Sequence, residues 1–185
     1  MNFVSRLLAA AATALVTLSA QAFPIAPPGT EGFSVVVSAT GPVIARYEGN
    51  SAAFSNNLFL NGTFIFNNQT SLVGSTVDLG SFAAGTELIF RLQVTNTSQN
   101  YFTGSASRNP DGQAHARVQD NFETGRTLVS FEDLFNGPFN FNDLSFSFTN
   151  TRSEVMAPVP EPETYAMLLA GLAALGVWSR RRKSA

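Results

Sequence analysis

The chain has 185 residues and a formal net charge of −2. It contains no cysteine, which excludes disulfides and thiol chemistry. Its length allows one domain of roughly 135 residues between two terminal segments that have the features of processing signals. Between Phe23 and Pro158 the chain carries 6 Arg, no Lys and 11 Asp plus Glu, a net charge of −5. This acidic, lysine-free body argues against nucleic acid or an anionic membrane surface as a partner, and it is compatible with binding divalent cations.

Residues 1–22 have the three-part organisation of a secretory signal peptide. A positive charge near the start precedes an apolar run, and Ala20 and Ala22 fit the small-x-small rule for cleavage before Phe23. A retained N-terminal membrane helix is the alternative, and the small residues at the cleavage position argue against it. We therefore expect an exported chain whose mature form begins at Phe23.

The segment after the signal peptide begins with a Pro/Gly linker, residues 23–31, and is then dense in β-strand signals. Residues 57–66 form two apolar-alternating halves about Asn61-Gly62, the strongest short-range hairpin signal. Other alternating or β-branched runs predict strands at 33–39, 43–47, 71–79 with a bulge at Gly74, 87–95, 115–119, 126–131 and 144–149.

Within residues 87–95, every second residue from Leu88 to Val94 is apolar, so these side chains are expected to share one face of a strand. No part of the body shows a 3.6-residue period long enough to predict a helix. About eight short strands separated by turn signals predict an all-β fold, an antiparallel β-sandwich or jelly-roll-like domain over residues 32–152. Phenylalanine is the main aromatic residue of this body, and we expect it to fill the core between the sheets.

Acidic and amide side chains gather in residues 109–148. Ca²⁺ takes roughly six to eight oxygen ligands from carboxylates, amides, backbone and water, and it tolerates irregular geometry. The candidate ligands for such an ion are Asp111, Glu132, Asp133, Asn136, Asn140, Asn142 and Asp143. The alternative is that these Asp and Asn side chains bond their own backbone and only shape the turn.

This stretch resembles an uncharacterised domain of bacterial surface proteins, whose signature runs G-x-E-D-x-x-G-G-D-x-D-F-N-D ahead of an alternating strand. The matching residues are Glu132-Asp133, Gly137 and Phe141-Asn142-Asp143-Leu144, and upstream Asp111-Gly112 and His115 resemble a P-D-G-x-x-H segment that often precedes the signature. The chain departs from the signature at Ser130, Pro138 and Asn140, which stand where the family has Gly, Asp and Asp. The two lost Asp residues weaken the charge that a calcium site needs.

The sequence gives little support for catalysis. It contains no G-x-S-x-G motif and no Gly-rich phosphate loop that opens a helix. His115, the only histidine, is flanked by alanines and is expected to be packed or hydrogen-bonded. Glu132 and Asp133 are adjacent and would point to opposite faces of a strand, which makes a poor acid–base pair. We therefore expect no catalytic residues and no enzymatic activity.

The C-terminal end has three parts in a fixed order. A linker, residues 153–163, contains the triplet Pro160, Glu161 and Pro162, and an apolar run from about Tyr165 to Trp178 opens the segment 164–185. The run is followed by a basic cluster of Arg180, Arg181, Arg182 and Lys183. Its roughly 14 to 16 residues reach about 21 to 24 Å as a helix, short of a hydrocarbon core of ~30 Å. We expect a marginal transmembrane helix whose basic end stays in the cytoplasm.

This order resembles the PEP-CTERM sorting signal of Gram-negative bacteria, here over residues 159–183. The resemblance implies that an exosortase, a membrane peptidase, cuts near Pro160-Glu161-Pro162 and releases or re-anchors the protein. The expected route therefore runs through the secretion machinery and an inner-membrane intermediate to the cell surface or the extracellular space. A plain C-terminal anchor with a proline-rich stem is the alternative, but it has no need of the triplet directly outside a short helix.

These observations predict a non-enzymatic structural protein of the cell surface or extracellular matrix, associated with exopolysaccharide or biofilm. The expected partners are exosortase, the secretion machinery, the inner membrane transiently and extracellular polysaccharide, with no nucleic acid among them. A Ca²⁺-dependent, lectin-like module that binds carbohydrate is the alternative, and Ca²⁺ is the only cofactor that the sequence suggests. A hydrolase is the third interpretation, and it would require a cleft with two converging carboxylates or a Ser-His pair.

Overall fold

The computed structural model describes residues 22–155 and, beyond them, Met167, Ala170 and Leu172. The body consists of twelve strands and one short 3-10 helix, η1 (Ala106–Arg108). The strands are β1 (Ser34–Val37), β2 (Gly41–Gly49), β3 (Asn56–Leu60), β4 (Thr63–Asn67), β5 (Thr76–Phe82), β6 (Glu87–Leu88), β7 (Phe90–Val94), β8 (Gln99–Phe102), β9 (Ala116–Glu123), β10 (Arg126–Phe131), β11 (Leu144–Thr149) and β12 (Thr151–Glu154). The pairings between these strands are antiparallel, so the predicted all-β, antiparallel fold is confirmed.

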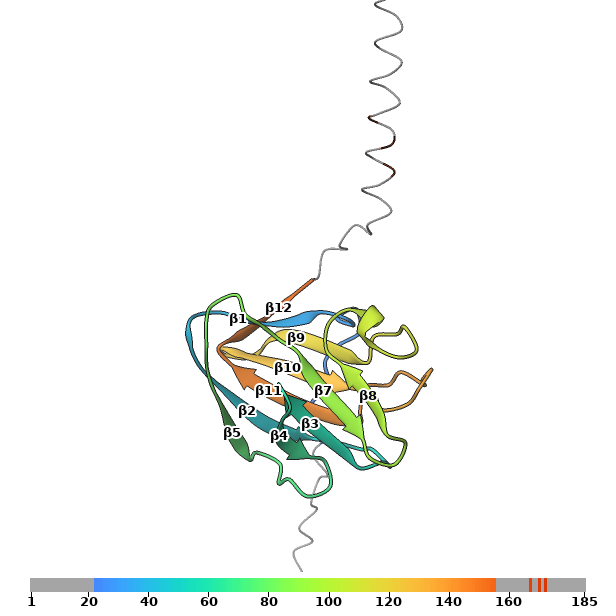
Figure 1. The fold of residues 1–185 in the computed structure, drawn as a ribbon. Helices are drawn as coiled ribbons and strands as arrows, with labels where there is room; N and C mark the ends of the chain where they lie inside the picture. Colours follow the sequence, from blue (N-terminus) through green and yellow to red (C-terminus); the bar gives the residue numbers. More distant parts are fainter. Residues whose placement is uncertain (1–21, 156–166, 168–169, 171, 173–185) are drawn as a thin grey trace, which may run out of the picture.

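The strands form three sheets. The five-stranded sheet has the order β5-β2-β11-β10-β9, the four-stranded sheet β4-β3-β7-β8, and the three-stranded sheet β12-β1-β6. Figure 1 shows the two larger sheets one over the other, with β1 and β12 along one end. Buried residues of all three sheets form one apolar cluster, which is consistent with the predicted β-sandwich. The finer description as a jelly roll stays a prediction.

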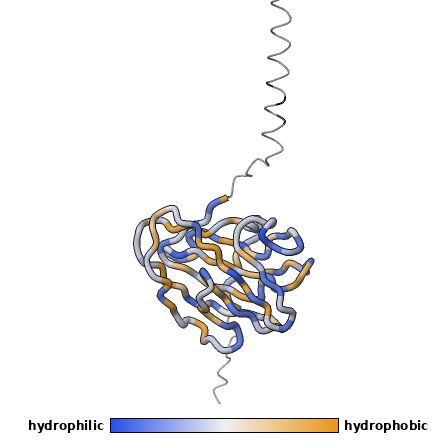
Figure 2. The backbone as a smooth tube through the Cα atoms, viewed as in Figure 1, coloured by the Kyte–Doolittle hydropathy of each residue, from blue (hydrophilic) through white to orange (hydrophobic). Residues whose placement is uncertain are grey.

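Phenylalanines join the two larger sheets across the core, as expected. The ring of Phe90 on β7 stacks on that of Phe148 on β11, with centroids 4.1 Å apart. Phe66 on β4 stacks in the same way on Phe146 of β11, at 5.8 Å. Figure 2 shows how hydrophobic and hydrophilic residues alternate along the strands, and β7 is a clear case because Phe90, Leu92 and Val94 are all buried.

The hairpin predicted at Asn61-Gly62 is confirmed. β3 and β4 flank these two residues, whose φ angles of 50° and 81° both lie in the left-handed region. Two consecutive positive φ angles define the type I′ turn, whose twist matches that of the strands on either side. The turn therefore fixes the register in which the inward face of β3 is presented to the core.

Several strand boundaries differ from the prediction. β5 begins at Thr76, so Gly74, at φ 85°, lies in the preceding turn and is not a bulge inside a strand. β8 and β12 were not predicted, because their sequences, QNYF and TRSE, are largely polar. Both are edge strands, and an edge strand with one solvated side does not need the apolar alternation of a central strand.

Residues 22–31 contain no strand, but they contact the outer face of the five-stranded sheet at Ser130 and then pair with its edge strand β9. Ala26 is buried, and its amide donates a hydrogen bond to Ser130 Oγ at 2.9 Å. The carbonyl of Thr30 accepts from the amide of Val118 at 3.1 Å, and Glu31 pairs with Arg117 at 2.7 Å. Ser130 also lies 2.9 Å from Ser145 on β11, oxygen to oxygen, so small side chains meet where Ala26 approaches the sheet.

The predicted signal peptide, apart from Ala22, lies outside the described residues, and so do the triplet and the basic cluster. The same holds for the predicted transmembrane helix, except for Met167, Ala170 and Leu172. In the part of the chain that the structure describes, no helix has the length and apolar character needed to span a membrane.

A candidate site of buried carboxylates

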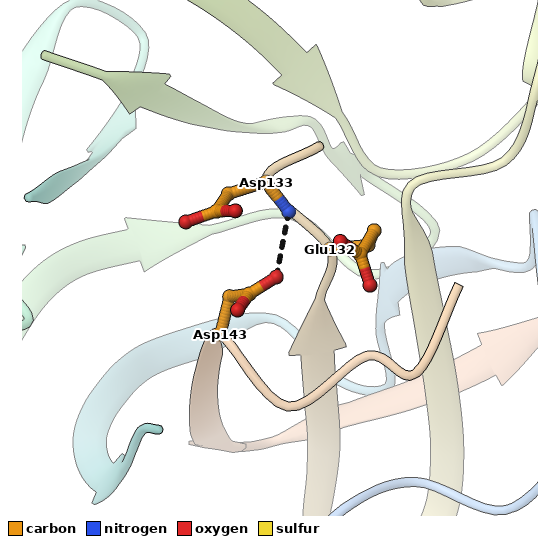
Figure 3. A group of neighbouring side chains, drawn as sticks. All are labelled: Glu132, Asp133 and Asp143. Carbon is orange, nitrogen blue, oxygen red and sulfur yellow. Dashed lines mark hydrogen bonds between the residues drawn. The ribbon is translucent and has the colours of Figure 1, made fainter. Parts of the chain in front are cut away.

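Three carboxylates meet at one end of the β10–β11 hairpin. β10 ends at Phe131, which pairs with Leu144 at the start of β11, so the two ends of the loop 132–143 lie side by side. Glu132 and Asp133 open this loop and Asp143 closes it, and one carboxylate oxygen of each lies within 4.8 Å of the others (Figure 3). The three residues are 0, 4 and 8% exposed, respectively.

Glu132 organises the loop through its carboxylate. Its Oε2 accepts hydrogen bonds from the amides of Asn140 and Phe141 at 2.9 and 3.2 Å, and its Oε1 accepts from the amide of Leu134 at 3.2 Å. These hydrogen bonds hold residues 140 and 141, near the end of the loop, against the end of β10. The fully buried charge is therefore balanced by backbone donors, as buried carboxylates require.

Asp133 and Asp143 are linked through the backbone, because the Asp133 amide donates to Asp143 Oδ2 at 2.9 Å. The expectation that Glu132 and Asp133 point to opposite faces of a strand is wrong. β10 ends one residue before Glu132, so the alternation of a strand no longer applies, and the two side chains join one cluster.

Burial raises the pKa of both aspartates to about 6, and their neighbouring carboxylates contribute to the increase. An amide hydrogen bond from Asn56 Nδ2 to Asp133 Oδ2, at 2.7 Å, acts in the opposite direction. Within residues 22–155, no arginine forms an ion pair with Glu132, Asp133 or Asp143. The cluster thus holds more negative charge than its protein partners neutralise.

His115 connects the cluster to Asp111. The ring is fully buried, with Nδ1 2.9 Å from the carbonyl oxygen of Glu132 and Nε2 2.9 Å from Asp111 Oδ2. A backbone carbonyl only accepts hydrogen bonds, so Nδ1 donates to the Glu132 carbonyl, and Nε2 faces the Asp111 carboxylate. The expectation that this histidine is packed and hydrogen-bonded is confirmed.

Asp111 is ionised in this arrangement. Burial by itself would raise its pKa, but hydrogen bonds from the Asn136 amide, the His115 ring and the Gln113 amide hold the pKa below its ordinary value. The Asn136 and Gln113 amides lie 3.0 and 3.1 Å from the carboxylate oxygens. The Asp-Gly-x-x-His segment therefore forms a tight turn that is hydrogen-bonded to the loop 132–143 through Asp111 and His115.

Two polar residues that sequence reasoning missed also reach the cluster. Asn56 is fully buried, and its Oδ1 has no hydrogen-bond partner among the described residues. Tyr101 on β8 stacks on His115 with ring centroids 3.7 Å apart, and its buried hydroxyl likewise has no partner within residues 22–155. Burial, together with the charges of Asp111, Asp133 and Glu132, raises the pKa of Tyr101 to about 12. The one sequence signal that could have identified Asn56 is that it is a polar residue at an inward position of β3.

The remaining candidate ligands serve the loop. Asn136 and Asn140 are exposed and Asn142 is half-buried. Asn136 takes the left-handed conformation, at φ 59°, and the side-chain Oδ1 of Asn140 accepts from the Asn142 amide at 3.3 Å. The structure thus separates the seven candidate residues into three clustered carboxylates, the His115-linked Asp111 and three asparagines that shape the turn.

One comparison with known proteins identifies a part of the chain. A family model described as the PEP-CTERM protein-sorting motif matches residues 158–183, which include the triplet Pro160-Glu161-Pro162 and the basic cluster from Arg180 to Lys183. The chain therefore carries the sorting signal of an exosortase substrate, as the resemblance predicted, and the motif implies export towards the cell surface. No curated protein and no solved structure matches the chain. The likeness of residues 109–148 to a surface-protein domain stays a prediction.

The raised pKa values give the cluster an unusual pH dependence. With a chelator present, we expect the free energy of unfolding to fall as the pH rises from about 5 to 7.5. The folded state holds the protons of Asp133 and Asp143 up to a pKa of about 6, against an ordinary 3.8. The stability that these bound protons give to the folded state is therefore complete below the ordinary pKa of 3.8, and it is lost as the pH rises through about 6. A two-unit shift in one group corresponds to about 3 kcal/mol.

Guanidinium denaturation at several pH values measures this dependence. The variant in which both Asp133 and Asp143 are replaced by asparagine should show a flatter profile over the same range. A stability of the wild-type protein that increases from pH 5 to pH 7.5 would contradict the prediction.

Proposed function

We propose that the protein is a structural component of the cell surface or extracellular matrix, exported and sorted by an exosortase, and without catalytic activity. The observation that carries this proposal is the position of the sorting motif. The last strand of the β domain ends at Glu154, and the motif begins at residue 158. A cut near the triplet would free the β domain almost at its own boundary, so the domain is the part delivered to the surface.

The burial of the polar groups supports a structural role over a hydrolytic one. The three carboxylates converge, as a hydrolase would require, but they are at most 8% exposed, and Glu132 is fully buried. His115 is also fully buried and has a protein partner on each ring nitrogen. A general acid or base must come within hydrogen-bond reach of its substrate, and these groups instead hold the loop.

A lectin-like role in extracellular polysaccharide is a second candidate, because of what the loop 132–143 exposes. Phe135 is 49% exposed, and the amide side chains of Asn136 and Asn140 lie on the same exposed loop. An aromatic ring and amides are suited to stacking on and hydrogen-bonding a sugar. A glycan array probed with and without chelator separates the candidates, since chelator-sensitive binding would favour the lectin-like role.

Replacing Pro160, Glu161 and Pro162 together by alanine should abolish C-terminal processing in the native host. The expected result is an uncut protein that accumulates in the inner-membrane fraction, because the peptidase no longer has its recognition triplet. Mass spectrometry of the purified protein gives the C-terminus directly, and cell fractionation gives the location.

Val155→Ala is the matched control, since Val155 lies outside the motif and its side chain is exposed. A host strain without exosortase should reproduce the effect of the triplet variant. Normal trimming and release of the triplet variant would rule out sorting through this motif.

A further inference from the structure

We propose that Glu132, Asp133 and Asp143 bind a divalent, oxygen-preferring cation, Ca²⁺, and that Asn56 and Tyr101 complete its surroundings. The ion would lie between the two larger sheets and join them. This inference goes beyond the proposed function and does not depend on how the chain is sorted.

The first argument is the balance of charge. The three carboxylates bring their oxygens within 4.8 Å of one another in a place that is almost fully buried. His115, which lies beside the cluster, is already bonded to Asp111 and to the backbone of Glu132. Burying like charges together is costly unless a cation or protons neutralise them, and a divalent ion does so at neutral pH.

The second argument is independent of the acidic residues and comes from two polar atoms without partners. The amide of Asn56 faces the cluster, since its Nδ2 donates to Asp133, but its Oδ1 is buried and has no partner in the described chain. The Tyr101 hydroxyl is fully buried in the field of the same carboxylates and is also unpaired there. Buried polar atoms in folded proteins are nearly always satisfied, so Asn56 Oδ1 and the Tyr101 hydroxyl are each available to a bound ion or to a water that the ion holds.

The donor set selects the kind of ion. It consists of carboxylate and amide oxygens with a phenolic hydroxyl nearby, and it contains no sulfur. Such oxygen donors suit Ca²⁺ or Mg²⁺, and an irregular arrangement that keeps some water ligands suits Ca²⁺. A water bound to the ion would give the Tyr101 hydroxyl the partner that the protein does not supply.

The position of the ligands gives the ion a structural role. Asn56 begins β3 and Tyr101 lies on β8, both in the four-stranded sheet, whereas the carboxylates lie at the ends of β10 and β11 in the five-stranded sheet. Only the folded chain brings these segments together, so the ion would stabilise the folded state alone. Calcium sites of extracellular modules have a Kd on the order of 10⁻⁴ to 10⁻³ M, and we expect a value in this range.

Calorimetric titration of the full-length protein in detergent tests the proposal, after the protein has been treated with chelator and dialysed. Addition of CaCl₂ should show one saturable site per chain and raise the Tm by about 5 °C at a large excess over Kd. Asp143→Asn should weaken binding at least tenfold. Asp120→Asn, which changes an exposed aspartate on β9, should leave binding unchanged. No saturable binding, or full affinity in Asp143→Asn, would overturn the proposal.

A second measurement keeps the test decisive if Asp143→Asn does not fold. Tb³⁺ replaces Ca²⁺ and luminesces when a nearby tyrosine is excited, so the wild-type protein should give a Tb³⁺ signal that CaCl₂ displaces. Tyr101→Phe keeps the ring on His115 and removes only the hydroxyl, and it should lose most of that signal. Tyr47→Phe, which changes a core tyrosine that bonds Asn68, is the control. Tb³⁺ luminescence of wild-type strength in Tyr101→Phe would mean that the ion binds elsewhere, and it would contradict the proposal.

Discussion

Replacing Glu132 by alanine is expected to lower the free energy of unfolding by about 4 kcal/mol, enough to remove a large part of the stability of a single domain. The side chain is fully buried, and its carboxylate accepts hydrogen bonds from three loop amides. Alanine would leave these donors without a partner and a cavity beside them, and each hydrogen bond to a charged group contributes about 1.5–3 kcal/mol. Because the three bonds act together, the cost is less than their sum.

Denaturation in guanidinium at neutral pH measures this loss, with chelator present so that no contribution from a bound ion is included. Glu132→Gln keeps the shape and one oxygen but turns an amide group towards backbone donors, so we expect about half the loss of Glu132→Ala. Glu154→Ala, which removes a half-exposed carboxylate at the end of β12, should have no measurable effect. A loss below about 1 kcal/mol for Glu132→Ala would mean that other contacts hold the loop.

The sequence predicts the part of the fold that depends on local signals. The bounds of β10 and β11 match the predicted runs 126–131 and 144–149, and the turn at Asn61-Gly62 was identified from its two residues alone. These strands contribute residues to the core, so apolar residues occupy their inward positions and make the alternation visible in the sequence. β8 was missed because only Tyr101 in it faces the core, and a single inward residue gives no period.

The sequence points to the stretch of chain that carries the three carboxylates, but it does not point to Asn56 or Tyr101. Glu132, Asp133 and Asp143 belong to one loop, so their proximity follows from the hairpin that surrounds them. Asn56 lies 77 residues before Asp133, and their contact depends on how one sheet packs on the other. No local pattern encodes that packing, so the residue that completes the cluster became visible only in the three-dimensional arrangement.

Replacing Phe146 by alanine should cost about 4 kcal/mol, a loss as large as that of Glu132→Ala and due to packing alone. Phe146 is fully buried on β11, and its ring lies 5.8 Å from both Tyr47 and Phe66. Phe66 belongs to the four-stranded sheet, so the substitution opens a cavity between the sheets in addition to removing apolar contacts.

Phe64→Ala is the matched control, because Phe64 lies on β4 two residues before Phe66 but is 52% exposed. It should cost less than about 1 kcal/mol. The double variant Phe66→Ala/Phe146→Ala should cost less than the sum of the single variants by about 1 kcal/mol, since the second substitution removes contacts already lost. Equal losses for Phe64→Ala and Phe146→Ala would contradict a core that lies between the two larger sheets, because a fully buried ring has more contacts to lose than a half-exposed one.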